Sequence, residues 1–91
     1  MEVIWSPASL RQIEDIHDYI AQDNPAAAAR MADSLHEAGR GLVMFPQRGR
    51  PVVGTMMREI IVRPYIIRYI VDGDRVLILR VRHGARRPTN P

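Results

Sequence analysis

The spacing of apolar residues predicts two helices in the first half of the chain. A short apolar segment at residues 2–5 predicts a strand, and Ser6-Pro7 then places a capping side chain before a proline at the first helical position. The apolar positions that follow recur at helical spacing and predict a helix as far as about Asp23. His17 lies on this apolar stripe, so we expect it to be a core residue.

A second helix follows with almost no connecting loop. Asn24-Pro25 repeats the combination of cap and proline, as in a helical hairpin. From Ala28 to Leu42 the apolar residues follow one helical face, and Phe45-Pro46 ends the helix. Gly39 and Gly41 are expected to weaken its last turn, because glycine is a poor helix former.

The pattern changes to that of a sheet in the second half. Residues 46–55 contain two prolines and two glycines and are expected to form a loop. Further along, Asp72-Gly73 is a strong signal for a two-residue hairpin turn. The runs around that turn predict three strands, at residues 56–63, 65–71 and 75–82.

These elements predict an α+β fold with the order β-α-α-β-β-β. The two helices are long enough to lie as a hairpin across one face of a mainly antiparallel sheet of three or four strands. A chain of 91 residues fits one domain, so we expect a single domain over residues 1–91, with residues 84–91 as a flexible tail.

Both faces of the predicted sheet carry apolar residues, although helices can cover only one of them. If the hairpin is regular, one face combines arginines with aromatic rings, a surface suited to phosphates and bases or to an acidic, apolar peptide. Alternatively, the tyrosines are core residues with hydrogen-bonded hydroxyls. The uncovered face must meet a partner, lie under the 46–55 loop or stay exposed. The mixed face would carry Tyr65, Ile67, Tyr69, Val71, Val76, Ile78, Arg80 and Arg82, joined by Arg58, Ile60 and Val62 if Arg63-Pro64 is the preceding turn. The other face would carry Ile66, Arg68, Ile70, Arg75, Leu77, Leu79, Val81 and His83.

Composition narrows the class of protein. The chain has no cysteine, which excludes a disulfide scaffold, and it shows neither a signal peptide nor a membrane-spanning run, so we expect a cytoplasmic protein. Residues 1–45 carry three arginines against seven acidic residues (3 − 7 = −4), and residues 46–91 carry ten against three (10 − 3 = +7). All 13 basic residues are arginine, which suits bidentate contacts to phosphate or carboxylate but also follows from a GC-rich genome.

Candidate chemistry is sparse. The three histidines are far apart in sequence and no nucleotide-binding glycine loop is present, so we expect no metal and no cofactor. The one constellation that could act on RNA consists of arginines, which can stabilise a phosphorane, and of His83, which could serve as acid or base. A complete acid–base pair would also need Tyr65, Tyr69 or Glu59. The constellation comprises Arg58, Arg80, Arg82, His83, Arg86 and Arg87.

The order of motifs along nearly the whole chain resembles the RelE/ParE superfamily of bacterial toxins. The matching segments are Ile4-Trp5-Ser6-Pro7-Ala8, Ile16 with Tyr19-Ile20-Ala21, Asn24-Pro25 with Ala28, Leu42 with Phe45-Pro46, Gly49-Arg50, Arg58-Glu59-Ile60, Tyr65-Ile66-Ile67-Arg68-Tyr69, and Val81 with His83, Arg86, Arg87 and Pro88. The resemblance implies the toxin of a type II toxin–antitoxin pair, and it implies the same α+β fold. It also implies an antitoxin that is encoded by a neighbouring gene and whose extended C-terminal segment wraps the toxin. We expect this antitoxin to be acidic.

Two activities occur in this superfamily. ParE-like members inhibit DNA gyrase, whereas RelE-like members cleave mRNA on the ribosome without a metal. Met56 and Met57 stand where those nucleases carry lysines, and the Trp-Ser-Pro, Phe-Pro and Tyr-x-x-x-Tyr motifs look more like ParE. The resemblance therefore favours a gyrase inhibitor that is not an enzyme. A RelE-like endoribonuclease is the alternative, and a binding module without toxicity is a further one.

Site residues follow from the same resemblance. For an mRNA interferase we expect Arg58, His83 and Arg86 to be catalytic. Contacts to the target are expected from Arg58, Tyr65, Tyr69, Arg80, Arg82, Arg86 and Arg87, and contacts to the antitoxin in a hetero-oligomer from Ile16, Tyr19, Ile67, Ile78 and Arg80.

Overall fold

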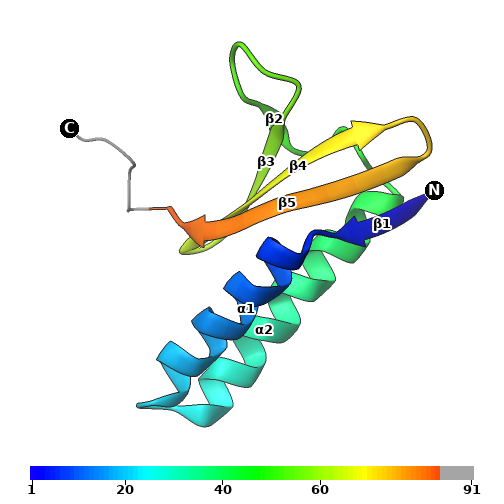
Figure 1. Ribbon diagram of the computed structural model, residues 1–91. Helices are drawn as coiled ribbons and strands as arrows, with labels where there is room; N and C mark the ends of the chain where they lie inside the picture. The colour runs from blue at the N-terminus through cyan, green and yellow to red at the C-terminus, as the bar shows by residue number, and fades with distance from the viewer. Residues whose placement is uncertain (85–91) are drawn as a thin grey trace.

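The computed structural model describes residues 1–84 and has the predicted α+β architecture, a helical hairpin against a mainly antiparallel sheet (Figure 1). Of the predicted flexible tail, only Gly84 lies within the described residues, and its N–H donates to the carbonyl of Pro64 at 2.8 Å. The elements are β1 (Glu2–Trp5), α1 (Pro7–Ala21), α2 (Pro25–Arg40), the 3₁₀ helix η1 (Gly41–Val43), β2 (Arg50–Pro51), β3 (Arg58–Val62), β4 (Tyr65–Asp72) and β5 (Arg75–His83).

The first helix begins at the predicted cap and ends two residues before the predicted end. The side chain of Ser6 accepts a hydrogen bond from the N–H of Ser9 at 3.0 Å, as an N-cap does, and its hydroxyl also donates to the carbonyl of Leu79 in β5 at 3.0 Å. The prediction of a core histidine is wrong. The His17 side chain is 41% exposed, and its Nδ1 lies 3.2 Å from the carboxylate of Asp18.

The second helix starts at the predicted cap, where the side chain of Asn24 accepts from the N–H of Ala27 at 3.0 Å. Its apolar face is buried through Ala28 and Leu35. Gly39, which was predicted only to weaken the last turn, is buried between α2 and β1. A Cβ at this position would overlap the ring of Trp5.

The sheet has five strands in the order β1-β5-β4-β3-β2. β1 pairs parallel with β5, and all other pairs are antiparallel. Two turns join the antiparallel strands as predicted: Arg63-Pro64, whose peptide bond is cis, and a hairpin in which Gly73 has φ +63°. The short strand β2 was not predicted; it lies inside the segment expected to be a loop.

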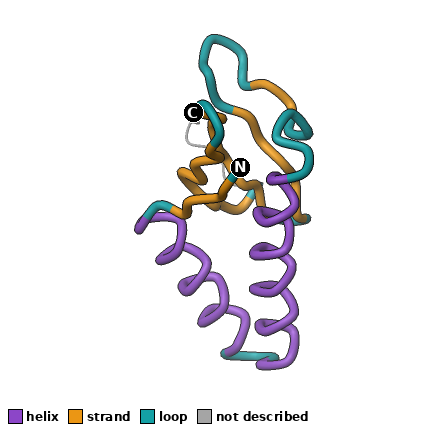
Figure 2. Tube along the Cα trace, turned by 90° about the vertical axis from the view of Figure 1, so that its right-hand side faces the viewer, coloured by secondary structure: helices purple, strands orange, loops and turns teal. Residues whose placement is uncertain are grey.

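The core lies between the hairpin of helices and one face of the sheet. Figure 2 shows α1 and α2 running side by side, with the turn between them directed away from the sheet. Residues of α1, α2 and η1 pack there against alternate residues of β3, β4 and β5. The buried apolar cluster consists of Ile13, Leu35, Leu42, Ile60, Tyr65, Ile67, Tyr69, Val76, Ile78 and Val81.

A β-bulge in β5 overturns the predicted distribution of arginines between the two faces. Arg68 pairs with Arg80 and the next residue, Tyr69, pairs with Ile78, so Leu79 is an extra residue in β5. Beyond this bulge every side chain of β5 changes face relative to a regular hairpin. Arg80 and Arg82 therefore lie on the open face, and Val81 and His83 lie on the face of Tyr65, Ile67 and Tyr69.

Candidate macromolecule-binding site

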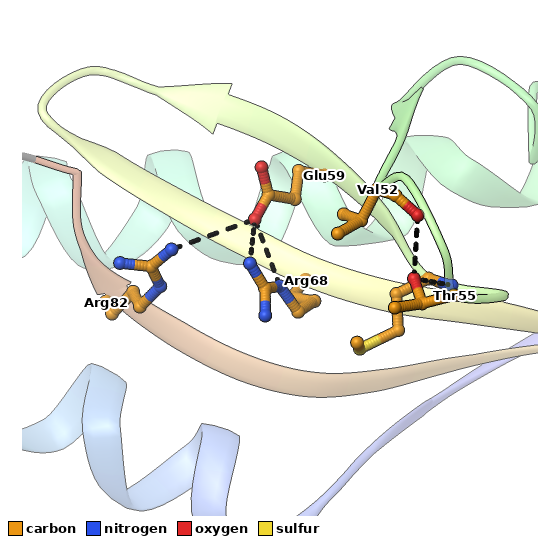
Figure 3. A network of polar contacts seen from close by, with 6 residues as sticks. Val52, Thr55, Glu59, Arg68 and Arg82 are labelled. Carbon is orange, nitrogen blue, oxygen red and sulfur yellow. Dashed lines mark hydrogen bonds and ion pairs between the residues drawn. The ribbon is translucent and has the colours of Figure 1, made fainter. Parts of the chain in front are cut away.

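The sheet face turned away from the helices combines apolar residues with arginines. Ile61 is 54% exposed there, and its partner in β4 is Ile66, which in turn lies opposite Arg82. The loop that leads to β3 crosses close to this face, where the hydroxyl of Thr55 donates to the carbonyl of Val52 at 2.9 Å (Figure 3). A hollow of about 320 Å³ is lined by Arg50, Pro51, Val52, Glu59, Ile66, Arg68, Arg82 and Gly84.

A carboxylate lies among these arginines. Glu59 accepts from Nε of Arg68 at 3.0 Å and from the terminal nitrogen of the same guanidinium, and Nη2 of Arg82 lies 3.8 Å from the same carboxylate oxygen (Figure 3). The side chain of Glu59 is only 10% exposed, so its charge depends on these guanidinium groups for compensation.

Arg58 lies on the opposite face, near β2. It pairs with Tyr69 across the ladder, and its Nη1 donates to the carbonyls of Gly49 at 2.7 Å and Gln47 at 3.3 Å. Charged donors on main-chain carbonyls stabilise a loop that has no ladder of its own. The guanidinium group of Arg58 therefore holds the segment between η1 and β2 against the sheet.

Both tyrosines are buried, as the alternative of core residues predicts, and for Tyr69 the hydroxyl is hydrogen-bonded. Tyr65 is 7% exposed and Tyr69 is 0% exposed. The Tyr69 hydroxyl donates to the carbonyl of Pro46 and accepts from the N–H of Gly49, both at 2.8 Å. In this structure neither ring offers a face on which a base could stack.

His83 lies beside a groove between α1 and the ends of β4 and β5. Its ring packs edge-on against the ring of Tyr65, with centroids 5.4 Å apart. The groove has a volume of about 360 Å³. Its lining consists of Gln12, Asp15, Ile16, Tyr19, Tyr65, Val81, Arg82 and His83.

The predicted catalytic residues are not brought together within the described part of the chain. Arg58 pairs with Tyr69, whereas His83 pairs with Tyr65, four positions away along β4. Four strand residues correspond to about 13 Å, which is too far for two side chains to act on one phosphodiester in this conformation. Arg86 and Arg87 lie outside the described residues.

The predicted antitoxin contacts separate into two groups. Ile67 and Ile78 are 0% exposed beneath the helices, so the expectation that they are accessible is wrong. Tyr19 is 67% exposed, Ile16 is half-buried at the groove, and Arg80 is exposed on the open face.

Several residues at these surfaces were missed by the sequence prediction. The side-chain oxygen of Gln12 accepts from the N–H of Val81 at 2.7 Å and so ties α1 to β5 at the base of the groove. Glu59 and Arg68 were visible in the sequence as an acid and a base, but their pairing depends on strand register.

No helix in residues 1–84 is both long and apolar enough to cross a membrane.

Comparisons with known proteins place the chain in a family. The family described as the ParE toxin of the type II toxin–antitoxin system parDE matches residues 3–88. A protein of Caulobacter vibrioides named Toxin RelE2 is 42% identical over 85 residues, which cover 93% of this chain and 97% of the relative. Another, the putative toxin Y4kP of Sinorhizobium fredii, is 38% identical over 82 residues, covering 88% of this chain and 84% of the relative.

A solved structure is similar over the same length. It is a chain of the chromosomal ParDE system from P. aeruginosa, with a TM-score of 0.80 and 23% identity over 91% of this chain and 95% of that chain. At this identity the match supports the fold, the helical hairpin on a mixed sheet. The family match and the relatives make the assignment: the chain belongs to the ParE family of toxins of type II toxin–antitoxin systems.

Proposed function

We propose that this toxin acts in the cytoplasm by binding DNA gyrase and cleaves no bond itself. The observation that carries the proposal is the placement of Arg58. Its guanidinium group donates to two loop carbonyls, and it is about 13 Å along the sheet from the ladder position of His83. A nuclease would need these groups around one phosphate, whereas an inhibitor that acts by binding needs only a stable surface.

The proposal is tested with two assays on the purified chain. We expect inhibition of gyrase supercoiling and intact mRNA in a ribosome-programmed cleavage assay. Cleaved mRNA with uninhibited gyrase would overturn the proposal. Activity in neither assay would instead support a binding module without toxicity.

A RelE-like endoribonuclease is the second candidate, and the names of relatives favour it. Toxin RelE2 and a further Caulobacter protein, Toxin RelE1, at 34% identity over 86 residues, carry the name of the cleaving branch. If this chain cleaves mRNA, His83→Ala should abolish cleavage. If it inhibits gyrase by binding, the mRNA should stay intact with both the wild-type protein and this variant.

Membership of the family implies an antitoxin partner. We infer that the antitoxin is acidic and that it covers the open sheet face and the groove beside α1. Exposed Ile61 and the arginines of the open face support this inference, because they match an acidic chain with apolar side chains. A structure of the complex in which either surface stays uncovered would contradict it.

A further inference from the structure

The arginines of the open face form a row that one carboxylate interrupts. Arg50 in β2 lies opposite Glu59 in β3, Glu59 lies opposite Arg68 in β4, and Arg68 lies opposite Arg80 in β5. Arg82, two residues further along β5, also reaches Glu59. The row with Arg82 thus holds four positive charges and one negative charge.

Burial divides these arginines into two kinds. Arg68 and Arg82, which contact Glu59, have side chains 24% and 27% exposed. Arg50 and Arg80, at the two ends of the row, are exposed. A new anion that approaches Arg68 or Arg82 must compete with the carboxylate of Glu59, which is fixed within the sheet. No carboxylate within residues 1–84 pairs with Arg50 or Arg80 in this way.

A nucleic-acid strand and an acidic peptide interact differently with such a row. A nucleic-acid strand carries a negative charge at every nucleotide, so a strand laid along the row brings phosphates close to Glu59. An extended peptide can place acidic side chains opposite Arg50 and Arg80 and a neutral one opposite Glu59. Repulsion from a poorly hydrated carboxylate is strong at short range because the local dielectric constant is low.

We propose that Glu59 is a selectivity residue that keeps this arginine-rich face from binding nucleic acid and reserves it for an acidic, extended segment of a protein partner. The proposal concerns what the face binds and not which enzyme the toxin inhibits. Its test on the isolated chain therefore has an outcome independent of the gyrase assay.

The direct test is Glu59→Gln, with Asp72→Asn as its matched control. Both substitutions raise the net charge by one, and both remove a carboxylate paired with an arginine, but Asp72 pairs with Arg75 at the hairpin end, four residues from Arg68 along β4. Binding of a short fluorescent oligouridylate is measured by anisotropy between about 50 and 200 mM salt. Circular dichroism and thermal melting verify that each variant is folded.

For Glu59→Gln we expect binding about tenfold tighter at the lowest salt and a salt dependence steeper by about 0.7 to 1.4, which corresponds to one or two added phosphate contacts on a single strand. Asp72→Asn should change the affinity for the oligouridylate less than twofold, because Asp72 lies away from the row. A peptide of alternating Glu and Ala, matched in charge to the oligonucleotide, should gain less from Glu59→Gln than the oligonucleotide does. Equal gains for the two ligands, or equal effects of the two substitutions, would overturn the proposal.

A second comparison keeps Glu59 in place and so does not depend on the folding of the first variant. If Glu59 already occupies Arg68, then Arg68→Lys should weaken oligouridylate binding less than Arg80→Lys, although each keeps its positive charge and replaces a bidentate donor by a single ammonium group in the same row. An equal or larger loss for Arg68→Lys would show that Arg68 binds phosphate despite Glu59, and the proposal would be wrong.

Discussion

The buried hydroxyl of Tyr69 fixes the path of the chain between η1 and β2. It bonds to both Pro46 and Gly49, so one side chain satisfies a donor and an acceptor in a segment that has no ladder of its own. Gly49 is required for this approach, because a Cβ there would lie 2.6 Å from the hydroxyl oxygen. The Phe-Pro and Gly-Arg motifs of the sequence thus meet at one tyrosine.

Removal of this hydroxyl should be costly. Tyr69→Phe leaves the buried N–H of Gly49 and the carbonyl of Pro46 without their partner, so we expect the free energy of unfolding to fall by about 1–3 kcal/mol. Urea denaturation measures the change. The control is Tyr19→Phe, which removes the hydroxyl of a ring that is 67% exposed and should alter stability by less than about 0.5 kcal/mol. Equal effects in the two variants would show that the Tyr69 hydrogen bonds do not hold the loop.

Among the secondary-structure elements, α2 contacts β1 and β5 at a glycine near its C-terminal end. A Cβ at Gly39 would overlap the ring of Trp5 and lie 2.8 Å from the end of the Ile78 side chain. The absence of a side chain therefore allows the end of α2 to approach β1 and β5. The sequence suggested only that this glycine weakens the helix; its packing role depends on tertiary contacts.

Two neighbouring glycines provide a test of this packing. In an exposed helix, replacement of Gly by Ala stabilises by about 1 kcal/mol. We expect Gly39→Ala instead to destabilise the protein by about 1–3 kcal/mol, because Trp5 and Ile78 must move. Gly41→Ala is the control. Its Cβ would meet only Arg48 at 3.6 Å, and its φ of −64° suits alanine, so stability should be unchanged or higher. Thermal unfolding of both variants measures these changes in stability, and a stabilising Gly39→Ala would refute the packing argument.

The sequence predicted the elements better than it predicted what each sheet face carries. Proline caps and the Asp-Gly turn act locally, so α1, α2 and the β4–β5 hairpin could be located from a few residues. Nothing in the run from Val76 to His83 marks Leu79 as an extra residue, because every position there suits a regular strand. That single residue moved Arg80 and Arg82 to the open face.

The candidate site was predicted only in part for the same reason. Residue type indicated that arginines would matter, but not that Arg58 would bind a loop or that Glu59 would lie between Arg68 and Arg82. Strand register decides these contacts, and register is a property of the folded sheet. β2 was missed because two residues, Arg50 and Pro51, carry no periodic pattern.

For the molecule as a whole, the helices and most of the sheet differ in the sign of their charge. The N-terminal half of the sequence, which forms β1 and the helices, is acidic, and the half that forms the remaining strands is basic. The groove lined by Tyr19 and Arg82 lies where the two halves meet. A partner that spans this boundary can bury an aromatic ring and neutralise arginines in one interface.

This arrangement predicts the effect of truncating Tyr19. Tyr19→Ala should weaken binding of the antitoxin about tenfold, or about 1.4 kcal/mol, because an exposed aromatic ring at a groove is a typical anchor. Isothermal titration calorimetry measures the affinity. Met44→Ala, at a side chain 74% exposed on the loop after η1, is the control and should leave the affinity unchanged. A greater loss for Met44→Ala would place the antitoxin elsewhere.

The parallel pairing of β1 with β5 also has a consequence for biosynthesis. Its ladder joins residues 2–5 to residues 75–78, and the cap of α1 bonds to Leu79, 73 positions later in the sequence. Contacts at such separation form late, because a long stretch of chain must first be ordered. The growing polypeptide therefore cannot assemble the complete sheet until β5 has been translated. A chain interrupted before that strand would lack Arg80, Arg82 and one side of the groove, so the surface proposed to bind the antitoxin is complete only once β5 has been made.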